Sequence, residues 1–170
     1  KTGTLTKGNF VLNRYKSINE KYEDRDILRF AGAVEAKSEH PLAAGILEKI
    51  KEEKIDLPEA NDFNAITGKG IEATVDEINV KVVSPGYLEE NSIDMPESIN
   101  TEDRETLIYL VIEDKVTGFL TLADEIRSES YDAIRTLKKK GIKVYMLTGD
   151  NEKVARSVSE ELDLDGYFAG

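Results

Sequence analysis

The sequence predicts an α+β fold in the middle of the chain, with an antiparallel sheet flanked by helices, and an α/β arrangement at its end. Three observations carry this prediction. Two helical patterns are followed by short strand patterns that tight turns connect. The last third alternates strand and helix patterns, which is typical of a parallel sheet. The 170 residues are enough for both parts to bury a core of their own.

The first third contains one strand pattern and two helical patterns. Phe10 to Ile18 is predicted to be a strand. Asp24 is predicted to cap a helix that ends near Lys37. Pro41 fits the first position of a second helix, with His40 at the joint. Apolar residues share one face of each helix: Ile27, Phe30, Ala31 and Val34 in the first, and Leu42, Ile46 and Ile50 in the second.

The middle of the chain is rich in strand patterns. From Asp62 to Val83 we expect strand, glycine turn, strand, hairpin and strand, with Asp76-Glu77 as the hairpin turn. A second hairpin is predicted from Leu107–Ile112 and Val116–Leu122. Connections this short require antiparallel strands. The stretch from Glu89 to Glu105 is predicted to be a loop or linker.

The last third is predicted to run strand, helix, strand, helix with a parallel sheet. The first helix ends at Gly141, after its apolar positions Ile126, Ala133, Ile134 and Leu137. Ile142 to Leu147 is predicted to be a buried strand, and Asp150 to cap a helix that carries Val154, Val158 and Leu162. Ligands of such sheets bind at the carboxyl ends of strands, so the first residues of the chain and residues 148–150 are expected to meet there.

Composition excludes several classes of function. Cysteine is absent, which excludes disulfides, thiolate metal sites and cysteine nucleophiles. The formal charge of −11 repels nucleic acid, so no nucleic-acid partner is expected and a bound polyanion needs local donors. No apolar run approaches the roughly 18 residues of a membrane span, and no signal peptide is present, so the chain alone is expected to be soluble.

Five short motifs span nearly the whole chain, and their order resembles that of heavy-metal-transporting P-type ATPases, copper pumps most of all. They are Lys1-Thr2-Gly3-Thr4-Leu5-Thr6, Ser38-Glu39-His40-Pro41, Thr67-Gly68-Lys69-Gly70, Asp124-Glu125-Ile126-Arg127 and Thr148-Gly149-Asp150-Asn151. The resemblance implies a nucleotide-binding domain at residues 14–116. It would be inserted in a haloacid-dehalogenase-like phosphorylation domain formed by residues 1–13 and 117–170, the second part being incomplete.

The resemblance also implies a phosphoryl-transfer site. Its candidate catalytic residues are Lys1, Thr2, Thr4, Thr148, Gly149 and Asp150. The acceptor aspartate of the family precedes the position of Lys1, so the chain is expected to be an inactive fragment. The Thr2 carbonyl is expected to contact Mg²⁺. Related phosphatases have an aspartate at the position of Thr2, and threonine, which cannot act as the acid or base there, favours a pump.

A nucleotide site is implied by the other motifs, with ATP and Mg²⁺ as the expected cofactors. Glu35, His40, Gly68 and Gly70 would hold the adenine, while Asp124 and Arg127 would lie around the nucleotide and the hinge. Each has a structural alternative. A lone histidine beside proline is commonly structural, paired glycines can form a turn or bulge, and Asp124, Arg127 and Asp150 could form an ion pair or a cap.

One departure from the family pattern and two alternatives remain. Ser84-Pro85-Gly86 replaces a common Gly-Asn, and Pro85 has no amide to donate, so its part in ATP binding is in doubt. The alternatives are a soluble haloacid-dehalogenase-type phosphatase with a cap domain and a regulatory nucleotide-binding module. As part of a pump, the chain would be a monomeric cytoplasmic portion of an integral membrane protein. Its partners would then be ATP or ADP and the pump's own membrane helices and actuator domain.

Overall fold

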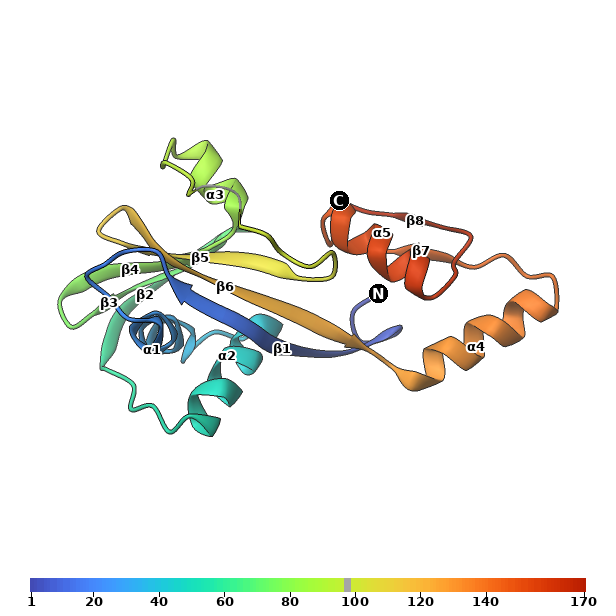
Figure 1. The fold of residues 1–170 in the computed structure, drawn as a ribbon, viewed down its shortest axis with the longest axis horizontal. Helices are drawn as coiled ribbons and strands as arrows, with labels where there is room; N and C mark the ends of the chain where they lie inside the picture. The colour runs from blue at the N-terminus through green and yellow to red at the C-terminus, as the bar shows by residue number, and fades with distance from the viewer. Residues whose placement is uncertain (97–98) are drawn as a thin grey trace. The chain divides into compact units, whose positions relative to one another are not determined.

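The computed structural model describes residues 1–96 and 99–170 and contains a six-stranded sheet with the strand order β1-β6-β5-β4-β3-β2 (Figure 1). The strands of this sheet are β1 (Thr6–Ser17), β2 (Ala60–Ile66), β3 (Gly70–Val75), β4 (Ile78–Val83), β5 (Thr106–Ile112) and β6 (Lys115–Ile126). The helices are α1 (Asp24–Glu35), α2 (Pro41–Glu52), α3 (Pro85–Glu90), α4 (Ser128–Lys139) and α5 (Glu152–Glu161). A second, two-stranded sheet pairs β7 (Tyr145–Leu147) with β8 (Gly166–Phe168).

The antiparallel sheet predicted for the middle of the chain is confirmed. Strands β2 to β5 pair antiparallel in chain order. Asp76 and Glu77 form the predicted hairpin turn, with φ values of 47° and 67°. Glu113 and Asp114 close the second hairpin, with φ values of 48° and 61°. Positive φ at both central residues is the geometry that suits the twist of paired strands.

Helices cover both faces of this sheet. Helix α1 packs on β2, β3 and β4 and against α2, and the two helices lie on one face (Figure 1). Leu88 of α3 is fully buried in a cluster on the other face. The buried members of that cluster come from α3 and three strands: Val83, Leu88, Tyr109, Val111 and Phe119. Because β4 and β5 are covered on both faces, the apolar residues of β5 run almost without interruption.

The two predicted helices of the first third are confirmed, but the first is capped by a different residue. Glu23 is the N-cap of α1, and it forms a capping box with Asp26. Asp24 is already helical, and its carboxylate accepts from the Ser17 amide and pairs with Lys16. The same helix ends at Glu35 rather than near 37.

Helix α3 lies in a stretch where no helix was predicted. Ser84 is its N-cap and Pro85 occupies its first turn, where a missing amide leaves no helical hydrogen bond unmade. The predicted loop from 89 to 105 therefore begins only after Glu90. Residues 97–98 of that stretch lie outside the described residues.

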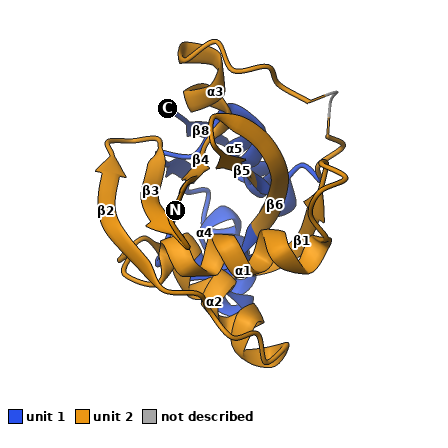
Figure 2. Ribbon diagram, turned by 90° about the vertical axis from the view of Figure 1, so that its left-hand side faces the viewer, with its two compact units in different colours: residues 1–10, 102–106, 123–170 blue, residues 11–101, 107–122 orange. Residues whose placement is uncertain are grey.

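The chain divides into two compact units (Figure 2). Unit 1 comprises residues 1–10, 102–106 and 123–170, and unit 2 comprises residues 11–101 and 107–122. These divisions lie a few residues from the predicted boundaries at 13/14 and 116/117. Unit 1 also includes the short segment before β5, which the sequence did not single out.

A parallel pair, as predicted for the last third, is present between β7 and β8. Its second strand, residues 166–168, was not among the predicted strands. The predicted buried strand from Ile142 to Leu147 is wrong in length and burial. Only Tyr145–Leu147 is a strand, and within it Tyr145 is 54% and Leu147 76% exposed. Met146 alone of these three points into the unit's core, because that core covers one face of the two strands.

The helical face predicted before Gly141 is partly wrong. Ile126 is the last residue of β6, and Ala133 and Leu137 are exposed. Ile134 is buried and packs with residues of β7 and α5. A single strip of α4 therefore meets the core of unit 1. Among the residues the structure describes, no helix combines the length and the apolar composition that crossing a bilayer requires.

Candidate functional site

The predicted site residues fall into two groups. Glu35, His40, Gly68 and Gly70 belong to unit 2, and the remaining candidates belong to unit 1. Within unit 2 the first two lie where α1 ends and α2 begins, and the two glycines flank the turn between β2 and β3.

His40 lies at the N-terminus of α2 and caps it. Its Nδ1 accepts a hydrogen bond from the Leu42 amide at 3.3 Å, and its own amide donates to the Ser38 hydroxyl at 3.2 Å. An accepting Nδ1 means that the proton of the neutral ring lies on Nε2. His40 is exposed, so this Nε2–H can donate a hydrogen bond to a ligand at the N-terminus of α2.

Glu35 is a buried carboxylate with one oxygen unsatisfied. Its side chain belongs to a residue that is 5% exposed, and Oε2 has no hydrogen-bond partner. Burial raises the pKa of the Glu35 carboxyl, and a hydrogen bond from the Ser38 side chain opposes that rise in part. Native structures rarely leave a buried polar atom without a partner, so this oxygen is a candidate for a ligand contact.

Glycine is favoured for a different physical reason at each of the two positions, 68 and 70. At Gly70, whose φ is +148°, a Cβ would lie 2.1 Å from the Val82 carbonyl oxygen and 2.8 Å from Val83 Cα. Gly70 is therefore required by the close approach of β4, its own neighbour in the sheet. Gly68, with φ of +70°, faces open space, since a Cβ there would meet nothing within 4 Å. Of the two, Gly68 offers backbone that a ligand can approach.

Contacts that sequence patterns did not reveal connect these segments. The Lys37 ammonium lies 4.7 Å from the centre of the Phe63 ring on β2, which attaches the α1–α2 connection to the sheet. Lys69, between the two glycines, forms an ion pair with Glu90 of α3, and its carbonyl accepts from the Ser84 amide at 2.8 Å. The Ser84-Pro85-Gly86 variant thus supports the glycine turn through the Ser84 amide.

In unit 1 the first and last motifs come together. The Lys1 ammonium, whose side chain is 2% exposed, pairs with the Asp150 carboxylate at 2.8 Å. The same carboxylate accepts from the Thr148 hydroxyl at 2.5 Å. The predicted cap of α5 is corrected by one residue: Asn151 is the N-cap, and its side chain accepts from the Val154 amide at 3.0 Å. Asp150 forms the ion pair with Lys1 and does not cap the helix.

Thr2, Thr4 and Gly149 lie in the same two motifs as this ion pair. The threonines are exposed, and a Cβ on Gly149 would meet nothing within 4 Å. The Thr4 amide donates to the Lys1 carbonyl at 3.1 Å, which closes a tight turn. Amides and hydroxyls that face solvent beside a glycine turn are suited to anionic oxygens. Among the described residues, no three His, Cys, Asp or Glu side chains gather as a metal site would need.

Asp124 and Arg127 do not form the ion pair that was one of their structural alternatives. Asp124 accepts from the Thr6 hydroxyl and the Gly8 amide, and Arg127 donates to the carbonyls of Thr6 and Gly3. Thr6, which the sequence analysis quoted within a motif without giving it a role, is the residue that both side chains contact. It is fully buried at the start of β1.

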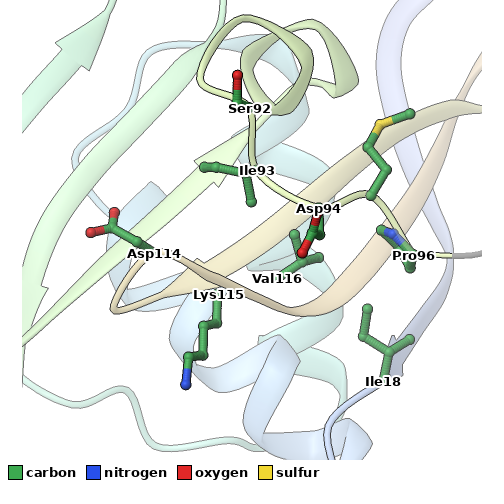
Figure 3. A pocket seen from close by; sticks show the side chains of 9 residues that line it. Ile18, Ser92, Ile93, Asp94, Pro96, Asp114, Lys115 and Val116 are labelled. Carbon is green, nitrogen blue, oxygen red and sulfur yellow. The ribbon is translucent and has the colours of Figure 1, made fainter.

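A cavity of about 500 Å³ lies elsewhere in unit 2, between the segment after α3 and the β5–β6 hairpin (Figure 3). Ile18, Ile93 and Val116 are among its lining residues, together with Asp94 and Lys115. None of the predicted site residues lines it. The cavity therefore adds nothing to the nucleotide site predicted from the motifs.

Comparison with known proteins identifies relatives over the full length of the chain. A family model described as haloacid dehalogenase-like hydrolase matches residues 1–170. The copper-exporting P-type ATPase B of Archaeoglobus fulgidus is 44% identical over 171 residues, which cover 99% of this chain and 24% of the relative. The protein of the same name from Enterococcus hirae is 36% identical, covering 100% and 23%. The chain spans about a quarter of the length of these relatives.

Solved structures agree with these relatives. The catalytic domain of the CPx-ATPase CopB-B, solved in a study of conformational changes upon nucleotide binding, superposes with a TM-score of 0.73 at 27% identity, covering 99% of this chain and 58% of that one. A zinc-transporting PIB-type ATPase in its E2.Pi state gives a TM-score of 0.69 at 30% identity, covering 100% and 28%.

Proposed function

Because this chain belongs to the haloacid dehalogenase-like hydrolase family, we propose that it is the ATP-binding catalytic portion of a P-type ATPase. The parent protein would transport a heavy-metal ion, copper, across a membrane, and its reaction cycle would include an aspartyl-phosphate intermediate. The identity of 33–44% to copper-exporting P-type ATPases supports this proposal. Membrane helices and an actuator domain would be supplied by the rest of that parent.

The two compact units fit this proposal. Unit 2 would be the nucleotide-binding domain, and its antiparallel sheet would be inserted between two parts of a phosphorylation domain. Unit 1, with its parallel strands and the two motifs that meet at Lys1 and Asp150, would belong to that phosphorylation domain. The proposed inserted domain, residues 14–116, would comprise most of unit 2.

The observation that carries the proposed nucleotide site is the unpartnered Oε2 of Glu35. A buried acceptor without a donor costs free energy, and a ligand that supplies an N–H removes that cost. The 6-amino group of adenine is such a donor. The exposed ring of His40 supplies a face for stacking on the base and an Nε2–H for one of its nitrogens, and Gly68 leaves room for the nucleotide.

Unit 1, taken by itself, would provide a phosphoryl-transfer site. Thr2 and Thr4 offer exposed hydroxyls and Gly149 lies in open space, while the Lys1–Asp150 pair and the bond from the Thr148 hydroxyl to Asp150 would fix the turns that carry them. Mg²⁺ is held in proteins by few protein ligands together with waters and phosphate oxygens. The Thr2 carbonyl is the proposed protein contact for it, and phosphate and water would complete its shell.

Calorimetric titration of the 170-residue chain with ATP, ADP and GTP tests the nucleotide site. We expect ATP and ADP to bind with Kd values of roughly 0.1–1 mM, or about 4 to 5.5 kcal/mol. GTP should bind at least about tenfold more weakly, because it presents a carbonyl oxygen where adenine presents the amino group to Glu35. Equal affinities for ATP and GTP would contradict the assignment of Glu35.

Matched variants separate the base contacts from general effects. Glu35→Met removes both carboxylate oxygens and should weaken ATP binding about tenfold. His40→Asn keeps a side chain that can cap α2 and should weaken binding several-fold through loss of the ring. Glu39→Gln removes one charge from the same motif and should leave the affinity within about twofold. If all three variants bind ATP like the parent chain, the nucleotide lies elsewhere.

A further inference from the structure

The corner between β6 and α4, residues 124–130, holds the first turn of the chain. We propose that Asp124 and Arg127 are positioning residues that fix the backbone of residues 3–8, and that neither contacts the nucleotide. The inference rests on the proposed function, in which the Lys1–Thr6 motif takes part in phosphoryl transfer. It replaces the nucleotide contacts that the family resemblance implied for these two side chains.

Both oxygens of Asp124 are already occupied. Oδ2 accepts from the Thr6 hydroxyl at 2.5 Å, and Oδ1 accepts from the Gly8 amide at 3.0 Å. Asp124 is 8% exposed and Thr6 is fully buried. This carboxylate is buried, and the donor on each of its oxygens belongs to the chain itself. Its role is to join β6 to the beginning of β1.

Arg127 is occupied in the same way. Its Nε donates to the Thr6 carbonyl at 2.9 Å, and its terminal nitrogen reaches the Gly3 carbonyl at 3.4 Å. The Arg127 amide and the Ser130 hydroxyl both donate to the Leu5 carbonyl, at 3.0 Å and 2.9 Å. The planar fork of a guanidinium suits such paired acceptors better than a lysine ammonium does.

Hydrogen bonds therefore hold the first turn of the chain both from within and from the β6–α4 corner. The Lys1 carbonyl accepts from the amides of Thr4 and Leu5 within the turn, while the corner binds the carbonyls that face outward. A group that takes part in phosphoryl transfer must be held to within a fraction of an ångström, and a 1 Å displacement can cost about 100-fold in rate. Asp124 and Arg127 supply that restraint without touching the reacting atoms.

Amide hydrogen exchange combined with ATP titration tests this inference on the 170-residue chain. Asp124→Ala should speed exchange of the Gly8 amide and of residues 4–6 at least about tenfold. The Kd for ATP should stay within twofold, because the proposed adenine contacts in unit 2 carry most of the affinity. Asp124→Asn should restore most of the protection, because its amide can still accept from Gly8 and donate to the Thr6 oxygen. Glu125→Gln, in the same motif but paired with Lys7 on the surface, should change neither measurement.

Arg127→Gln provides an independent arm that does not depend on the fold surviving loss of Asp124. It should speed exchange in residues 4–6, with protection of β5 amides in unit 2 unchanged. Exchange that stays at the parent rate in both variants would overturn the inference, and so would an ATP affinity at least fivefold weaker in either. If the parent chain itself binds no ATP, the proposed nucleotide site fails, and the exchange measurements alone still decide whether this corner fixes the turn.

Discussion

Replacing Gly70 with alanine should destabilise the chain through the contact between β3 and β4. The backbone of Gly70 has φ of +148°, a region that side-chain-bearing residues occupy at a cost of about 1–3 kcal/mol. The added Cβ would also lie 2.1 Å from the Val82 oxygen, so the strands must separate by roughly 1 Å to reach ordinary contact distances. Overpacking of this kind costs about 1–3 kcal/mol. The two effects predict a loss of about 2–6 kcal/mol.

Urea denaturation followed by circular dichroism measures this loss, with two glycines as controls. Gly68→Ala carries the cost of positive φ alone, about 1–2 kcal/mol, because nothing lies near its Cβ. Gly86→Ala, in α3, should be neutral or slightly stabilising, because its Cβ would meet only the Ser84 hydroxyl, at an ordinary contact distance of 3.9 Å. The explanation is refuted if Gly70→Ala is no less stable than Gly68→Ala. It is also refuted if Gly70→Ala keeps its stability and loses ATP binding, since the glycine would then serve the ligand.

Three further predictions concern side chains. Glu35→Gln should be more stable than the parent at pH 7, and the gain should shrink toward pH 4. Burial raises the pKa of the Glu35 carboxyl in the folded state above its value in the unfolded chain. The stability that Glu35 contributes is therefore fully present below the unfolded-state pKa and is lost as the pH rises through the folded-state pKa. A gain that does not depend on pH in urea denaturation would contradict this. Asn151→Ala should cost about 1 kcal/mol in the same assay by uncapping α5, and Asn151→Ser should cost much less. Tyr15 donates to Glu53, and burial followed by this bond raises the pKa of Tyr15 to about 12. Tyr15→Phe should therefore cost less than about 1 kcal/mol at pH 8, since the pair is partly exposed, and the difference should fade as the pH rises from 10 through about 12.

The sequence predicted the middle sheet well because local signals there agree with tertiary packing. Asp76-Glu77 lies between two alternating runs, and such a pattern leaves one pairing register that buries both. The last third was predicted less well. An apolar run from Ile142 to Leu147 is typical of a strand covered on both faces, yet this strand is covered on one. Propensity cannot reveal how many layers a sheet will have.

The caps were wrong by a single residue in two helices for a common reason. Asp24 and Asp150 are good capping residues, but each carboxylate has a cation to bind, Lys16 and Lys1 respectively. The neighbouring residue then caps the helix. The partner lies outside the helix in both cases, so a pattern within the helix does not show it, and boundary shifts of one residue follow.

The candidate site shows the same limit. His40 as the cap of α2 follows from its place before Pro41, a local signal. That Glu35 is buried with an unpartnered oxygen depends on packing around the end of α1, which no spacing rule contains. The pairing of Asp124 with Thr6, separated by 118 positions, is likewise a tertiary fact.

A substitution in the acidic turn between β3 and β4 should raise the free energy of unfolding. Asp76 and Glu77 adopt positive φ without being glycine or asparagine, and they add like charges to a chain whose net charge is −11. Glu77→Gly, at φ of 67°, relieves both the conformational cost and one charge, for a gain on the order of 1 kcal/mol. The surface pair between Asp76 and Arg29 would survive this change. A background strengthened at this turn would let harmful substitutions in the α1–α2 connection be purified as folded protein and compared for binding alone.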